Sequence, residues 1–176
     1  MHGSSCRRAG ESGRTRRECA ESKSRQGKRP AVAAWGAASW AFGFAAVSFY
    51  WAAGGRIGVE TIARQIERVP LANDPRIVAA TGLAKVAAGG LPLALGWARP
   101  GSMGWRLLRV AAAIVGGGFA LYGSANFVDH GLMVSGLRQT PDVLGATAAR
   151  WHLLFWDPFW MLGGALSLAA ARWDGR

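Results

Sequence analysis

Cysteine is nearly absent from this chain of 176 residues, and its two cysteines, Cys6 and Cys19, both precede residue 31. They form no CxxC pair, and their spacing fits no known metal site. Because residues 31–176 contain no cysteine, no disulfide can stabilise a folded domain there. This absence argues against a membrane thiol oxidoreductase.

Large apolar side chains are missing from residues 1–30, which contain no Val, Ile, Leu, Phe, Tyr or Trp. The same segment carries nine Lys or Arg and three Glu. It cannot bury enough apolar surface to compensate for the entropy lost on ordering, so we predict a disordered basic cytoplasmic tail. The tail lacks interleaved aromatics and precedes a hydrophobic span, so we expect no nucleic-acid partner.

Charged residues are scarce in four later stretches, each long enough as a helix to cross about 30 Å of hydrocarbon. None shows the alternation typical of a membrane β-strand. The four stretches cover approximately residues 31–54, 76–98, 107–128 and 148–171. We therefore predict an all-α integral membrane protein in which residues 31–172 form a four-helix bundle in the lipid bilayer.

Lys and Arg are divided unequally between the two ends of these spans. With the N-terminus inside, 14 of the 21 lie on the inner side and six on the outer side. By the positive-inside rule, this distribution predicts a multi-pass plasma-membrane protein with both termini in the cytoplasm.

The first outer loop has an amphipathic pattern. Its apolar residues recur at helical spacing, with charged residues on the other side. The apolar positions are Val59, Ile62, Ala63, Ile66 and Val69. We predict a short amphipathic helix at the outer interface that caps the bundle, with partner binding as the less favoured alternative.

Small residues recur at every fourth position of the third span. They are Ala112, Gly116, Ala120 and Ser124. In lipid, such residues let helix backbones approach closely, and Gly163 and Gly164 offer the same in the fourth span. We expect a compact bundle, and small-residue faces of this kind also leave open an oligomer.

Two charged residues lie well inside the spans. Lys85 lies nine residues into the second span and Asp157 nine residues into the fourth. Both spans run in the same direction, so both residues lie about 14 Å deep. Charges in hydrocarbon usually face the bundle interior and pair, which predicts a Lys85–Asp157 ion pair. Pro158 lacks an N–H and frees the carbonyl of Leu154.

Further polar residues lie in the outer half of the bundle and extend this pair into a candidate polar cluster. Its members are Lys85, Asp157, His152, Asn126, His130 and Tyr50. The cluster either locks the helices together or forms a site for a small molecule, ion or proton. No HxxH, HxxxH or HExxH spacing and no phosphate- or dinucleotide-binding motif occurs, so we expect no metal and no cofactor.

Four segments carry a family resemblance. They are SFYWAAGG (48–55), GLAKVAAGG (82–90), LYGSANFVDHGLM (121–133) and TPDVLGATAARWHLLFWDPFWMLGG (140–164). They resemble the bacterial domain-of-unknown-function 3995 family of small four-span membrane proteins. The resemblance covers roughly residues 31–172 and includes Lys85, His152 and Asp157. It implies a membrane location and four helices, and no established activity.

Three hypotheses for function follow. The favoured one is a non-enzymatic membrane protein that binds or passes a small ligand through the polar cluster. The second is a membrane-embedded enzyme that uses His152, His130 and Asp157 in acid–base roles. The third is a structural or accessory subunit that works through helix contacts. A cavity at the cluster favours the first, and a histidine beside the acid in that cavity favours the second.

Overall fold

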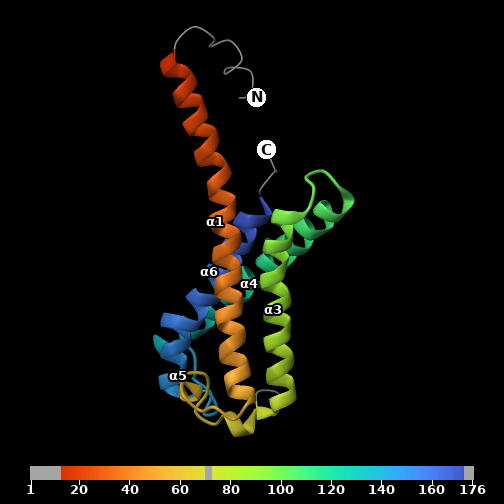
Figure 1. The fold of residues 1–176 in the computed structure, drawn as a ribbon. Helices are drawn as coiled ribbons and strands as arrows, with labels where there is room; N and C mark the ends of the chain where they lie inside the picture. Colours follow the sequence, from red (N-terminus) through yellow and green to blue (C-terminus); the bar gives the residue numbers. More distant parts are fainter. Residues whose placement is uncertain (1–12, 70–72, 173–176) are drawn as a thin grey trace.

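The structure is a computed structural model that describes residues 13–69 and 73–172, with side chains from Val32 onward (Figure 1). The described residues contain helices and no strand. The main helices are α1 (Gly13–Ala52), α3 (Pro75–Trp97), α4 (Met103–Val134), α5 (Gly145–Trp151) and α6 (Asp157–Ala171). A π-helical turn, η3 (His152–Trp156), joins α5 to α6, and two 3₁₀ turns, η1 (Val59–Thr61) and η2 (Ile66–Arg68), lie between α1 and α3.

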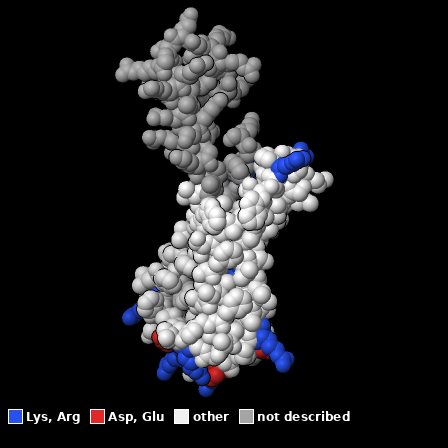
Figure 2. Space-filling view, viewed as in Figure 1, with Lys and Arg blue, Asp and Glu red and all other residues white. Residues whose placement is uncertain are grey.

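Four helical stretches are long and apolar enough to cross a membrane. They are Val32–Ala52, Pro75–Trp97, Met103–Val134 and Gly145–Ala171, the last formed by α5, η3 and α6 together. On the face shown in Figure 2, charged side chains gather near the two ends and leave the middle almost free of them. The predicted all-α fold with four membrane-spanning helices is confirmed, although the third helix extends well beyond the predicted residues 107–128.

The helix α1 begins at Gly13 and extends beyond the rest of the bundle (Figure 1). Residues 13–30, which we predicted to be part of a disordered tail, are helical in the structure, and residues 1–12 of that tail lie outside the described part. The physical reason is that a helix already nucleated by an apolar span lengthens at little cost. Arg, Lys and Glu, which supply half of residues 13–30, are good helix formers.

The bundle consists of two helix pairs, α1 with α3 and α4 with α6, which are joined where α1 packs on α6. The α4–α6 contact depends on small residues, as expected. A Cβ atom on Gly164 of α6 would lie 2.7 Å from the carbonyl oxygen of Gly116 in α4. Between α1 and α6 lies an aromatic core in which the buried rings of Trp40 and Phe44 contact Trp160.

The loop between α1 and α3 does not form the predicted amphipathic helix. It makes the two short 3₁₀ turns instead, and its backbone pairs with the loop before α5: the N–H groups of Arg64 and Gln65 donate to the carbonyls of Leu144 and Val143. These tertiary hydrogen bonds replace those of a helix. The apolar positions are still the less exposed ones: Ala63 is buried and the other four are half-buried, whereas the charged residues between them are exposed.

Candidate functional site

The segment that holds Asp157 departs from α-helical geometry. Over His152–Trp156 the chain makes one π-helical turn, in which the N–H of Asp157 donates to the carbonyl of His152, five residues earlier. Pro158 follows directly and has no N–H with which to continue the hydrogen bonding. In an α-helix, residues five apart face different directions, whereas the i→i+5 bonds of a π turn bring them onto one side. The turn therefore places His152 beside Asp157.

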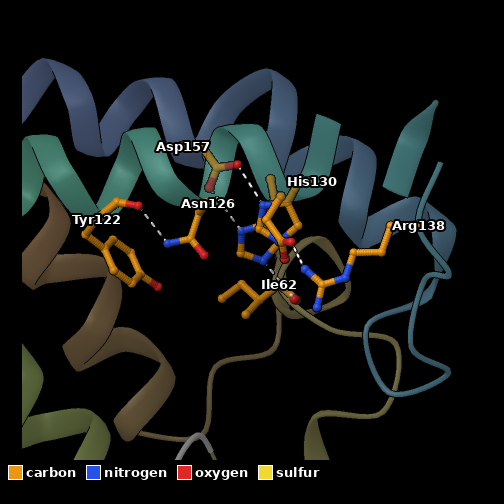
Figure 3. Close-up of polar contacts among 8 residues, drawn as sticks. Ile62, Tyr122, Asn126, His130, Arg138 and Asp157 are labelled. Atoms are coloured by element: carbon orange, nitrogen blue, oxygen red, sulfur yellow. Dashed lines mark hydrogen bonds and ion pairs between the residues drawn. The ribbon is translucent and has the colours of Figure 1, made fainter. Parts of the chain in front are cut away.

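A second histidine reaches the same carboxylate from α4. The Nδ1 atom of His130 donates to Oδ2 of Asp157 over 2.7 Å, and Asp157 is only 1% exposed (Figure 3). The ring of His152 stacks on that of His130, with the centroids 4.6 Å apart. The Nδ1 atom of His152 lies 3.8 Å from Oδ1 of Asp157, and its Nε2 donates to the carbonyl of Ile62 over 3.0 Å. We call His130, His152 and Asp157 the His–Asp cluster.

Lys85 has different partners, so the predicted Lys85–Asp157 ion pair is wrong. Its Nζ donates to Oγ of Ser48 at 2.9 Å and to Oγ1 of Thr81 at 3.5 Å, and it lies 4.3 Å from the centre of the Phe44 ring. Among the described residues, no carboxylate oxygen comes within 4.0 Å of it. Equal depth does not fix rotation about the helix axis: Lys85 points to α1, whereas Asp157 points to α4.

Lys85 and His152 share one cavity of about 260 Å³. Its polar side chains are Ser48, Thr81, Lys85, Tyr122 and His152, and its aromatic walls are Phe44, Trp51, Trp156 and Trp160. Three apolar residues of the loop between α1 and α3, Val59, Ile62 and Ile66, also line it. A hydrogen bond anchors this loop at the cavity: the indole Nε1 of Trp156 donates to the hydroxyl of Thr61 over 3.1 Å.

The six residues proposed from the sequence thus separate into three places. Lys85 and His152 line the cavity, and His130 and Asp157 lie behind His152 in the His–Asp cluster. Asn126 donates to the Tyr122 carbonyl of its own helix (Figure 3), and the hydroxyl of Tyr50 accepts from the Ile57 N–H. Neither of these two lines the cavity.

Sequence reasoning missed two parts of the site. The Ile62 carbonyl, which accepts from His152, belongs to an apolar residue, and no side-chain pattern could reveal a backbone partner. Ser48 lies near the end of the first span, but nothing in the sequence pairs it with Lys85, 37 residues away.

Comparison with known proteins assigns the chain to a family. The family model described as "Protein of unknown function (DUF3995)" matches residues 41–167. The chain belongs to the DUF3995 family. This confirms the resemblance seen in the sequence, and the matched region contains the whole cavity and the His–Asp cluster. No curated protein and no solved structure matches the chain.

The geometry of this DUF3995 protein favours binding over acid–base catalysis at the cavity. One nitrogen of His152 is used by the Ile62 carbonyl and the other faces Asp157. In this arrangement neither nitrogen is directed to a ligand in the cavity. The ammonium group of Lys85, by contrast, lies at the cavity wall among aromatic rings.

Proposed function

We propose that this DUF3995 protein is a four-span plasma-membrane protein, with both termini in the cytoplasm, that binds a small ligand in its cavity. The ligand has an apolar body and one anionic group. The observation that carries the proposal is the environment of Lys85, which is buried at the cavity wall with two hydroxyl acceptors and no carboxylate partner among the described residues.

The charge of Lys85 supports an anionic ligand. A buried ammonium group is costly unless an opposite charge compensates it. The Phe44 ring, 4.3 Å from Nζ, supplies part of this compensation through a cation–π interaction. The hydroxyls of Ser48 and Thr81 supply dipoles and no net charge. An anion in the cavity would provide the missing countercharge.

The size and walls of the cavity support a small, partly apolar ligand. Its volume of about 260 Å³ is near the lower end for small-molecule sites, which usually combine apolar walls with few polar groups. Here the walls combine four indole or phenyl rings with aliphatic side chains, and Lys85 is the one lysine in the lining. Because the loop between α1 and α3 forms one wall, we propose that the ligand enters from the outer side.

A pair of isosteric probes tests this function. Benzoate and benzamide have similar shapes and differ in charge, so the purified protein should gain a few degrees in Tm with benzoate and little with benzamide. The Lys85→Met variant should lose the response to benzoate. Arg150→Met, which removes an exposed cation away from the cavity lining, is the matched control and should retain it. Equal responses to both probes, or an unchanged response in Lys85→Met, would refute the proposal.

A further inference from the structure

The His–Asp cluster brings three potential metal ligands together, and the proposed binding of an anion by Lys85 does not account for this arrangement. His130 comes from α4, His152 from the π turn and Asp157 from the start of α6. One ligand atom from each residue can be chosen so that all three lie within 4.8 Å of one another. His130 and Asp157 are buried, and His152 is half-buried.

We propose that the His–Asp cluster binds a divalent transition-metal ion, with Zn²⁺ as the preferred ion. Two imidazole nitrogens and one carboxylate oxygen are the three-ligand set typical of zinc sites that keep an open fourth position. Imidazole ligands favour zinc and similar transition metals, whereas all-oxygen sites favour Mg²⁺ or Ca²⁺. The fourth position is left to water or to an anion.

The hydrogen bond to Ile62 supports this assignment independently of the cluster itself. Metal-ligating histidines usually donate their other ring N–H to a carbonyl or carboxylate, which fixes the tautomer. His152 does so: its Nε2 donates to the Ile62 carbonyl, which leaves the lone pair on Nδ1 in the neutral ring. That atom is the one that faces Asp157.

With this tautomer, no proton lies between Nδ1 of His152 and the Asp157 carboxylate. In a neutral His152, Nδ1 and the Asp157 oxygen are both acceptors, and they face each other across 3.8 Å, too far for a hydrogen bond. Two ligands of a tetrahedral zinc with bonds of about 2.0–2.1 Å lie roughly 3.4 Å apart. A cation between the two atoms would satisfy both lone pairs with little movement.

The proton on His130 is the group that the metal replaces. In the structure, Nδ1 of His130 donates this proton to Asp157 over 2.7 Å. Coordination through Nδ1 requires this proton to leave that atom: a neutral ring carries it on Nε2 instead, and a doubly protonated ring releases it to solvent. The two atoms move apart to the ligand–ligand spacing. The sequence grouped these three residues within the candidate polar cluster but did not indicate a metal site, because they lie 22 and five residues apart on separate helical segments and match no local metal motif.

Cobalt is a suitable probe, because tetrahedral Co²⁺ absorbs visible light and Zn²⁺ does not. The full chain should be purified without a polyhistidine tag, treated with a chelator, and carry Cys6→Ser and Cys19→Ser so that thiols do not compete. We expect one Co²⁺ per chain with tetrahedral absorption, displaced by one equivalent of Zn²⁺. His152→Ala and His130→Ala should each raise the Kd for Zn²⁺ by more than the roughly 10–100-fold typical of losing a second-shell partner.

Lys85→Met separates this proposal from anion binding, since Lys85 takes no part in the His–Asp cluster. It should bind Co²⁺ like the parent while losing its response to benzoate. Unchanged Zn²⁺ affinity in His152→Ala would overturn the metal site, as would a parent that binds less than one ion per chain. If the histidine variants fail to fold, X-ray absorption of the Zn²⁺-loaded parent decides. Scattering from two imidazole ligands supports the site, and a spectrum without imidazole scattering overturns it.

Discussion

His130 and Asp157 form a buried hydrogen bond of 2.7 Å that joins α4 to the first residue of α6. Lys85 lies on α3 and bonds to Ser48 of α1 instead. Each helix pair, α4 with α6 and α1 with α3, therefore has its own buried polar contact. The carboxylate of Asp157 stabilises one pair and does not link the two.

Double-mutant cycles test whether the two buried polar contacts are energetically independent. In the presence of a chelator, His130→Ala and Asp157→Ala should each lower the free energy of unfolding by roughly 1.5–3 kcal/mol, because a hydrogen bond to a buried charge is lost. The double variant should lose clearly less than the sum. For Lys85→Met with Asp157→Ala, which share no hydrogen-bond partner, the effects should add within about 0.5 kcal/mol. A larger coupling energy between Lys85 and Asp157 than between His130 and Asp157 would contradict the structure.

Close packing of α4 on α6 predicts different effects for two glycines. In Gly164→Ala the new methyl group would meet the backbone of Ala120 and Gly116, so we expect a loss of about 1–3 kcal/mol in unfolding free energy. At Gly118 of α4, a Cβ would meet no described atom within 4 Å. Gly118→Ala should therefore be neutral or stabilising by up to about 1 kcal/mol. Similar losses in both variants would argue against the tight contact.

The four helices follow from the sequence because lipid imposes a simple rule: a long stretch without charge must satisfy its own backbone as a helix. The close packing at Gly116 and Gly164 follows from a second property of helices in lipid, since small residues let their backbones approach closely. Burial of the apolar side of the first outer loop was also predictable from its periodicity, although its backbone geometry was not.

The arrangement of the site was only partly predictable. Depth along a helix can be counted from the sequence, and it placed Lys85 and Asp157 at one level. Which way each side chain points depends on helix rotation, and the extra residue of the π turn changes that rotation at His152. The Ile62 carbonyl depends on where a loop folds back, and this is set by backbone pairing with residues 143 and 144.

The loop between α1 and α3 should loosen when its anchor is removed. Trp156→Phe keeps an aromatic ring and deletes the donor to Thr61, which typically contributes about 0.5–1.5 kcal/mol. We expect amide hydrogen exchange in residues 59–66 to become several-fold faster. Trp151→Phe is the matched control, because no hydrogen bond of the Trp151 indole is seen among the described residues. Exchange that stays unchanged in Trp156→Phe would show that the loop is held by other contacts.

The proposed orientation predicts which loops face the outside of the cell. Cysteines can be placed one at a time in the Cys6→Ser/Cys19→Ser background, at Gln139 in the loop after α4 and at Met103, the first residue of α4. Both positions are exposed, and they lie near opposite ends of the 32-residue helix α4. A membrane-impermeant maleimide should label Gln139→Cys in intact cells.

Met103→Cys should react with the same reagent only after the cells are lysed, because the positive-inside rule applied to Arg99, Arg106 and Arg109 predicts that this end of α4 faces the cytoplasm. Labelling after lysis also serves as the control that each cysteine is accessible in the folded protein. The reverse pattern would place both termini outside and turn the cavity loop toward the cytoplasm. The ligand of Lys85 would then have to be sought among cytoplasmic anions.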